Sequence, residues 1–392
     1  MIYFAVLLYL LFSVIVYDVY EKKRHFRFHY IVLFFLLTLI AGLRWRLGLD
    51  TVNYIRPLSD LSFEYIMNSE YQPFWVLLNT FCKSFGDFTL VQILVSTFFH
   101  IAIFRFFYRC CKKPFTALSI FYIYNYFYFS MEIMRESLAI ACFLYGVMSL
   151  NKGSLIKYYM WAICAFMFHF FAIFLFVLPP ILKRKISLSK LVSIILIMFF
   201  LYMTFKMVLF THAVNIFLPN IGEKIIYYIL SEEEGTNNWS IRGITFNLFP
   251  LLVMFIFLYL RKKRNFGDLF NLKESIWIGC ILLYSIFLLL SLDMPVLMRF
   301  SNYFYMIIVI LYSSWFYAIR FKQKSQVLFI LCCFFFMISI RLYMLTKPEP
   351  AIVLDGSRMH IHNYIKYYPY TSVFNPQEPL ERKIRHSYWG DR

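Results

Sequence analysis

The chain has 392 residues, of which 61% are hydrophobic and 15% are charged, and its mean hydropathy is +0.66. Soluble domains contain about 45–50% apolar residues, so this composition excludes an ordinary soluble protein. A formal net charge of +18 would suggest nucleic-acid binding in a soluble chain. Here the basic residues gather in short clusters between apolar runs, as in the loops of membrane proteins, which argues against a nucleic-acid partner.

Apolar runs recur along the whole chain and predict an all-α, polytopic integral membrane protein with about twelve transmembrane helices. The first run has no basic stretch before it and no small-residue cleavage site after it, so we expect a retained helix and not a signal peptide. The expected spans lie near residues 2–20, 30–43, 88–107, 114–131, 133–150, 157–168, 170–182, 190–209, 243–260, 275–292, 297–318 and 325–345.

The apolar stretch around His169 can be interpreted as one span or as two. One span would place four basic residues outside, whereas two short spans that turn at His169 keep them inside. These residues are Lys183, Arg184, Lys185 and Lys190. Each arm is shorter than the usual ~20 residues and would need protein around it. Together with the other basic clusters, the two-span interpretation favours an N-terminus on the outer side.

The predicted organisation is a single transmembrane domain over residues 1–345 and a polar C-terminal tail over 346–392. The domain carries two long outer loops, residues 44–87 and 211–242. Within the first loop, residues 72–85 are apolar but short, which predicts a re-entrant or interfacial helix. We find no internal repeat and no separate soluble domain in the sequence.

Four separate regions bring arginine or histidine to the expected outer side, where the positive-inside rule disfavours arginine. These regions contain Arg44, Arg46 and Asp50, then Glu132, Arg135 and Glu136, then His169, and finally Asp293 and Arg299. Because the guanidinium group suits bidentate recognition of phosphate oxygens, the cluster indicates an anionic partner such as a lipid-linked diphosphate. The alternative for each arginine is ordinary: it extends to a lipid headgroup or pairs with a structural carboxylate.

Several residues of this set have more than one possible role. His169 has no polar neighbour in the sequence and is either a general base, a hydrogen-bond donor or a structural residue. Asp50 is either a base or the ion-pair partner of Arg44 or Arg46, and Gly48 is expected to serve a backbone turn. The many Tyr and Trp rings either stack on sugars or form the usual interfacial belts. No cluster of residues requires a metal ion or another cofactor.

The order and spacing of these residues resemble the EpsG family of Wzy-type polysaccharide polymerases. The family's first motif is matched by Arg44, Arg46, Gly48, Asp50 and Tyr54. Later elements are matched by Arg135-Glu136-Ser137-Leu138-Ala139, His169-Phe170-Phe171-Ala172, Arg299-Phe300-Ser301-Asn302-Tyr303-Phe304 and Pro369-Tyr370. The chain departs from the family pattern at Leu47, at Glu136 in place of glutamine, and at Phe171 in place of serine.

The resemblance implies an enzyme that joins oligosaccharide repeat units carried on undecaprenyl diphosphate at the outer face of the bacterial inner membrane. Its products would be capsular, exopolysaccharide or O-antigen chains, and its pathway partners would be a flippase and a chain-length regulator. The implied catalytic residues are His169, Asp50 and Arg135. The implied substrate-binding residues are Arg44, Arg46, Gly48, Tyr54, Glu136, Arg299 and Tyr303. The alternative function is a flippase or transporter of the same lipid-linked glycans, which would need the arginines but no general base.

Overall fold

The computed structural model describes residues 2–48, 50–55, 71–184, 193, 252–253, 256, 271–291, 297–318, 321–348, 352–354, 357–359 and 361–390. These residues are mainly helical, and one short hairpin pairs β1 (Ile352–Leu354) antiparallel with β2 (Ser357–Met359). Three described helices are long and apolar enough to cross a membrane: Ile2–Val19, Phe88–Cys110 and Gln323–Thr346. Several shorter apolar helices accompany them, as expected for an all-α membrane protein, while the number of twelve spans stays a prediction.

The chain divides into two units, and the first comprises Met1–Met148, Ile156–Phe170 and Ile319–Arg392. Its helical elements, in chain order, are α1 (Ile2–Ser13), η1 (Val14–Val19), α2 (Phe26–Gly42), α3 (Thr51–Ile55), α4 (Pro73–Phe85), α5 (Phe88–Cys110), α6 (Pro114–Tyr124), η4 (Tyr128–Glu132), α7 (Met134–Asn151), α8 (Leu155–Phe168), α16 (Gln323–Thr346), η7 (Asn363–Lys366) and α17 (Leu380–Gly390). The end of α7, from Ser149, belongs to the second unit.

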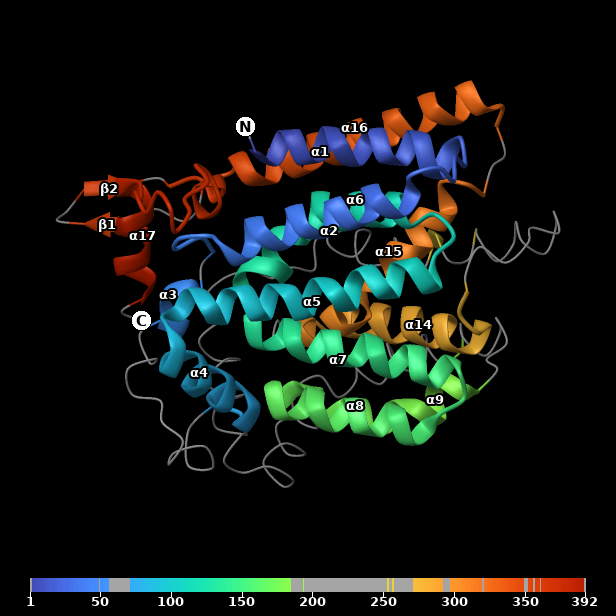
Figure 1. Ribbon diagram of the computed structural model, residues 1–392, viewed down its shortest axis with the longest axis horizontal. Helices are drawn as coiled ribbons and strands as arrows, with labels where there is room; N and C mark the ends of the chain where they lie inside the picture. Colours follow the sequence, from blue (N-terminus) through green and yellow to red (C-terminus); the bar gives the residue numbers. More distant parts are fainter. Residues whose placement is uncertain are drawn as a thin grey trace. The chain divides into compact units, whose positions relative to one another are not determined.

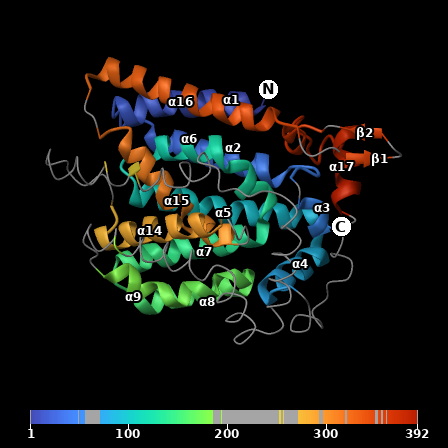
Figure 2. The ribbon, with the colours of Figure 1, turned by 180° about the vertical axis from the view of Figure 1, so that it is seen from behind.

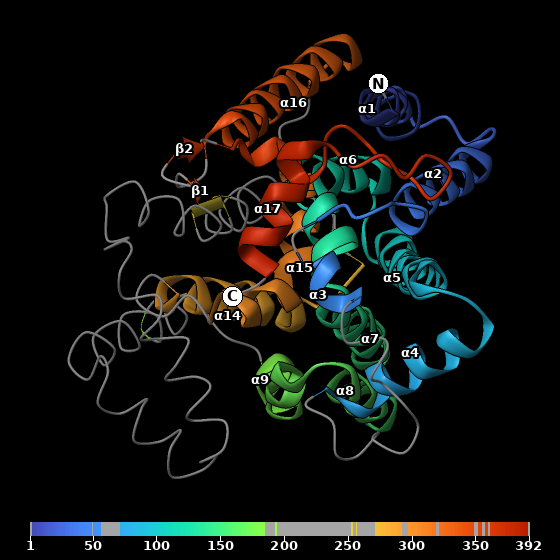
Figure 3. The ribbon, with the colours of Figure 1, turned by 90° about the vertical axis from the view of Figure 1, so that its left-hand side faces the viewer.

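The core of the first unit forms where apolar helices pack along one another. Helix α2 runs beside α5, and α1 packs against α6 (Figure 1). A glycine permits the close approach of α2 and α5, because a Cβ atom on Gly42 would lie 3.1 Å from the Cα atom of Ile93. The C-terminal helix α17 packs against α3 and η7, and Figure 3 shows it beside α3.

Local sequence explains where several of these helices begin. Proline occupies the first turn of α4 and α6, where its missing N–H group is tolerated. The side chain of Asp87 caps α5 by accepting a hydrogen bond from the Thr89 amide at 2.8 Å. Helix α6 is capped from outside its own segment, since the buried Asp18 carboxylate accepts bonds from the amide (2.6 Å) and the hydroxyl (2.8 Å) of Thr116.

The second unit comprises Ser149–Leu155 and Phe171–Ala318. Its described helical elements are η5 (Phe170–Val177), which begins one residue before the unit, α9 (Leu178–Lys183), α14 (Glu274–Leu290) and α15 (Met298–Trp315). Helix α14 packs against both α15 and α9 (Figure 2). The expected spans at 190–209 and 243–260 and the outer loop at 211–242 lie almost entirely outside the described residues.

Two sequence predictions concern short elements that the structure describes as helices. Residues 72–85 form α4, which begins at Pro73, ends at Phe85 and packs against α5; its re-entrant or interfacial character stays a prediction. The apolar stretch around His169 is interrupted there, since α8 ends at Phe168 and η5 begins at Phe170. Whether the two arms are separate spans also stays a prediction.

Candidate functional site

The first motif forms a loop between α2 and α3, and residues 44–48 of it are called here the signature loop. Arg44 is buried, and its guanidinium donates to three acceptors: the Ala41 carbonyl, the Met131 carbonyl (3.1 Å) and the Met134 sulfur (3.2 Å). Met131 and Met134 lie on either side of the break between η4 and α7, about ninety positions after Arg44 in the sequence. Arg44 therefore ties the signature loop to the start of α7.

Gly48 must be a glycine for two reasons, its backbone conformation and the lack of space for a side chain. Its φ angle is +91°, and a Cβ atom would lie 2.8 Å from the carbonyl oxygen of Met131. Its amide donates to the Lys366 carbonyl at 3.1 Å. The backbone turn expected at Gly48 is thus present, and it lets the loop lie directly against η4.

The first helical turn of α7 presents Arg135 to two tyrosine rings. The guanidinium carbon lies 5.0 Å from the ring centre of Tyr71 and 5.6 Å from that of Tyr54. The Nε atom of Arg135 is buried and has no hydrogen-bond partner among the described residues. An arginine held by aromatic rings with unused donor capacity is suited to bind an anion.

Tyr54 joins Arg135 to the apolar core of the site. It is buried, and its ring centre lies 5.2 Å from that of Trp75. Tyr54, Trp75, Met134 and Leu138 belong to one apolar cluster, against which Phe168 also packs. Because Phe168 directly precedes His169, the end of α8 reaches the same cluster as the Tyr54 and Arg135 segments.

The carboxylates and histidine of the predicted site lie in the same unit. Glu136 follows Arg135 in the first turn of α7 and is buried, as is His169, whose amide donates to the Ala165 carbonyl at 2.9 Å. Asp50 precedes α3, and its carbonyl accepts the amide of Tyr54 at 3.1 Å. Both Asp50 and Glu136 influence the electrostatic environment of Tyr54, which places their charges near that ring.

Arg299 and Tyr303 belong to α15 in the second unit. The Arg299 guanidinium carbon lies 5.7 Å from the ring centre of Phe171, and Tyr303 is fully buried with its ring 5.1 Å from that of Phe174. The first unit therefore brings together the signature loop, Tyr54, Arg135, Glu136 and the end of α8. The participation of Arg299 and Tyr303 stays a prediction from their motif.

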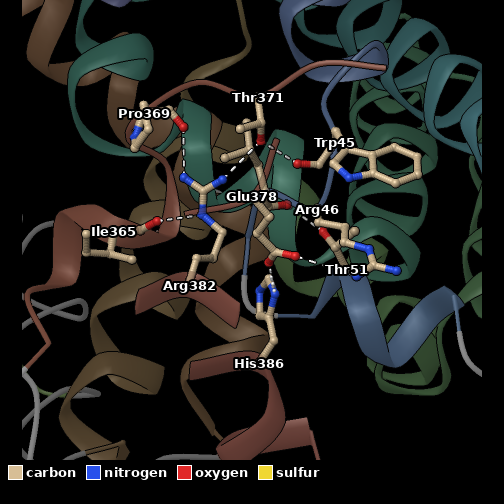
Figure 4. A network of polar contacts seen from close by, with 10 residues as sticks. Trp45, Arg46, Thr51, Ile365, Pro369, Thr371, Glu378, Arg382 and His386 are labelled. Atoms are coloured by element: carbon tan, nitrogen blue, oxygen red, sulfur yellow. Dashed lines mark hydrogen bonds and ion pairs between the residues drawn. The ribbon is translucent and has the colours of Figure 1, made fainter. Parts of the chain in front are cut away.

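The C-terminal segment contacts the signature loop through the predicted Pro369-Tyr370 motif and through residues that the sequence did not single out, such as Thr371 (Figure 4). The Trp45 amide donates to the Thr371 carbonyl at 2.9 Å, and the Val373 amide donates to the Leu43 carbonyl at 3.0 Å. Tyr370, of the closing Pro-Tyr motif, donates its hydroxyl to the Ile40 carbonyl at 3.1 Å. The last motif of the chain thus pairs with the first, beside η4.

A second set of such contacts fixes η4 itself. The Tyr367 hydroxyl donates to Glu132 at 2.6 Å, and the His100 Nε2 atom lies 3.1 Å from the Ser130 hydroxyl. Both His100 and Glu132 are buried. A π-helical turn inside an α-helical protein often marks a functional position, and here α5, the signature loop and the C-terminal segment all hold it.

Burial shifts the pKa values of Arg44 in the signature loop and of Tyr54 in α3 without making them titrate at neutral pH. Burial lowers the pKa of Arg44 to about 10, so it remains a cation. Burial raises the pKa of Tyr54 to about 12, with Arg135 opposing the shift, so it remains a neutral phenol. Neither side chain can therefore accept a proton at neutral pH.

Comparison with protein-family models matches residues 27–372 of this chain to the EpsG family. The matched residues include every motif described above. No curated protein and no solved structure matches the chain.

Proposed function

The chain belongs to the EpsG family, and on that premise we propose that it is a polysaccharide polymerase of the bacterial inner membrane. Its substrates are oligosaccharide repeat units carried on undecaprenyl diphosphate, and its active site faces the periplasm or the cell exterior. It acts in the same pathway as a flippase, which delivers the lipid-linked units, and a chain-length regulator. The products are capsular, exopolysaccharide or O-antigen chains.

The observation that carries this proposal is the position of Arg135. Its guanidinium contacts the rings of Tyr54 and Tyr71, and its Nε atom is buried without a hydrogen-bond partner among the described residues. The terminal nitrogens of the Arg44 guanidinium, by contrast, donate to two carbonyls and a sulfur atom, although its Nε atom likewise has no partner among the described residues. Arg135 is therefore the better candidate for direct contact with a diphosphate, and Arg44 is suited to hold Arg135 in place through Met131 and Met134.

In the proposed reaction, the diphosphate of the donor lipid leaves from the anomeric carbon of the donor glycan. The acceptor hydroxyl loses its proton to His169 or Asp50, and its oxygen forms the new bond to that carbon as the bond to the diphosphate oxygen breaks. Arg135 stabilises the negative charge that develops on the leaving diphosphate, and the family motif suggests the same role for Arg299. Arg46 completes the binding of the lipid-linked substrate in the first unit, and a binding role for Tyr303 rests on the family motif alone.

The cell surface distinguishes this proposal from the flippase alternative. A cell that lacks a polymerase still exports single repeat units, whereas a cell that lacks the flippase exports none. We expect a strain without this protein to carry single, unextended repeat units on its surface, detected by gel electrophoresis and mass spectrometry of surface glycans. Absence of single repeat units from that surface would contradict the polymerase and favour the flippase.

A further inference from the structure

Three side chains that follow the family-matched residues in the sequence support the signature loop, either directly or through neighbouring residues. Glu378, Arg382 and His386 follow one another at intervals of four, the last two on α17, and are called here the C-terminal clasp. The family match ends at residue 372, so none of the three belongs to a motif of the family. Figure 4 shows them gathered beside Trp45, Arg46 and Thr371.

Arg382 is the structural centre of the clasp. It is fully buried, and its guanidinium donates to the Ile365 carbonyl (2.8 Å), the Pro369 carbonyl (2.8 Å) and the Thr371 hydroxyl (3.0 Å). The Thr371 hydroxyl in turn donates to the Trp45 carbonyl at 2.6 Å. Arg382 thus fixes the segment 365–371 whose backbone binds the signature loop.

Glu378 connects the clasp to Arg46. One carboxylate oxygen lies 3.5 Å from an Arg46 nitrogen, and the other lies 2.6 Å from the Nδ1 atom of His386. The Glu378 side chain is almost fully buried, with 2% of its surface exposed, whereas 47% of the Arg46 side chain is exposed. The Arg46 guanidinium is therefore paired with a buried carboxylate while about half of its side chain remains exposed.

The backbone of Arg46 needs such support. Its φ angle is +47°, a left-handed conformation that is unfavourable for a residue with a side chain. Its guanidinium carbon lies 5.6 Å from the ring centre of Trp45, so it rests between an aromatic ring and a carboxylate. Both contacts restrict the directions in which Arg46 can point.

We propose that the C-terminal clasp positions the signature loop and that Glu378 orients the half-exposed Arg46 guanidinium toward an anionic ligand. This inference rests on the proposed function in one respect, since that ligand is the diphosphate of the lipid-linked substrate. Glu378 and Arg382 are positioning residues, because they contact the signature loop and its supporting segment and not the reacting atoms. The polar tail beyond residue 372 is accordingly part of the working enzyme.

The docking of the clasp can be measured without any assay of activity. Hydrogen–deuterium exchange of the full-length protein in lipid nanodiscs reports the amides of Trp45, Gly48 and Val373, which bond across the interface. We expect faster exchange in peptides covering 43–48 and 366–373 for the variants Glu378→Gln and Arg382→Gln. The matched control is Glu381→Gln, because Glu381 is exposed on the same helix. Unchanged exchange in both clasp variants, or an equal acceleration in the control, would refute the proposal that the clasp holds the signature loop.

The orienting role of Glu378 predicts a specific kinetic change. With purified lipid-linked repeat units as substrate, Glu378→Gln should raise KM about three- to tenfold and change kcat much less, as expected for one partly exposed ion pair. The double variant Arg46→Glu with Glu378→Arg restores the ion pair with reversed charges. It should regain slow exchange but not the normal KM. A normal KM in Glu378→Gln, or in the double variant, would refute the orienting role.

The exchange and kinetic measurements together distinguish a failure of the clasp proposal from a failure of the proposed function. If the unmodified protein makes no polymer, the proposed function fails, and the exchange experiment still decides whether the clasp holds the signature loop. If the unmodified protein makes polymer and Glu378→Gln leaves both exchange and KM unchanged, the inference fails and the proposed function stands.

Discussion

At the scale of single residues, the two most prominent arginines of the first unit are used differently. Arg44 is buried, and its terminal guanidinium nitrogens donate to acceptors of its own chain, while its Nε atom has no partner among the described residues. Arg135 contacts the rings of Tyr54 and Tyr71 through its guanidinium face, and its buried Nε atom has no hydrogen-bond partner among the described residues. A sequence motif cannot distinguish these roles, because both residues appear as arginines at the expected outer end of a span.

The replacement Gly48→Ala should destabilise the protein and abolish polymer. The left-handed φ angle of +91° costs roughly 1–2 kcal/mol for a residue with a side chain. The added Cβ atom would also lie 2.8 Å from the Met131 carbonyl oxygen, so η4 must move. The matched control is Gly153→Ala, since Gly153 has φ +89° but nothing within 4 Å of its Cβ position. Thermal unfolding of the two purified variants should show the larger loss for Gly48→Ala; equal losses would contradict a role for close packing.

At the scale of elements, the helices were predictable and their connections were not. Long apolar runs predict helices such as α1, α5 and α16, because a helix that crosses a membrane needs about 20 mainly apolar residues. The return of residues 365–373 to the signature loop depends on backbone hydrogen bonds between segments far apart in sequence, which leave no pattern. The clasp left a weak signal, since Glu378, Arg382 and His386 share a spacing of four, but a solvated helical face shows the same spacing.

His169 occupies the break between α8 and η5, and its replacement separates an enzyme from a transporter. The variant His169→Gln keeps hydrogen-bonding capacity but cannot accept a proton at neutral pH. We expect polymerisation to fall about 10²–10⁴-fold while single repeat units still reach the surface, as measured by gel electrophoresis of surface glycans. Full-length polymer would leave Asp50 as the candidate base, and loss of single repeat units would favour a transporter.

The C-terminal clasp should loosen in acid. Burial would raise the pKa of Glu378, but the hydrogen bond with His386 and the charges of Arg46 and Arg382 lower it below its ordinary value of 4.5. A carboxylate with a lowered pKa in the folded state contributes stability above its unfolded pKa, and this contribution is lost as the pH falls through the folded pKa. The melting temperature of the unmodified protein should therefore exceed that of Glu378→Gln by about 1–3 °C at pH 6.

This difference should disappear as the pH falls through the lowered pKa of Glu378, where its carboxyl group becomes protonated. Glu381→Gln is the control and should match the unmodified protein throughout, because Glu381 is exposed. A difference that persists unchanged to pH 3 would show that the Glu378 charge is not its source.

At the scale of the whole molecule, the two units carry different parts of the predicted site. The motifs of Arg44, Arg135 and Pro369-Tyr370 meet in the first unit, together with the end of α8. The Arg299 motif lies in the second unit, and its participation follows only from the family membership of the chain. Chain orientation in the membrane follows from the distribution of basic residues and so remains a sequence prediction.

That orientation can be tested by labelling single cysteines in intact cells. In a cysteine-free background, cysteines at positions 50 and 237 should react with a membrane-impermeant reagent, whereas one at position 262 should react only after the membrane is permeabilised. Positions 237 and 262 lie outside the described residues. Labelling at 262 without labelling at 50 or 237 would reverse the orientation and place the arginine site on the wrong side for the proposed reaction.

The most direct test of the central claim is polymer synthesis by the purified protein from lipid-linked repeat units, followed by a gel. The account predicts a ladder of glycans, lost in Arg135→Ala and not restored by Arg135→Lys, because lysine cannot form a bidentate contact with phosphate. Arg105→Ala should keep the ladder, although Arg105 also lies over a tyrosine ring, at 5.9 Å from that of Tyr145. A normal ladder from Arg135→Ala, or no ladder from the unmodified protein with its matched substrate, would contradict the account.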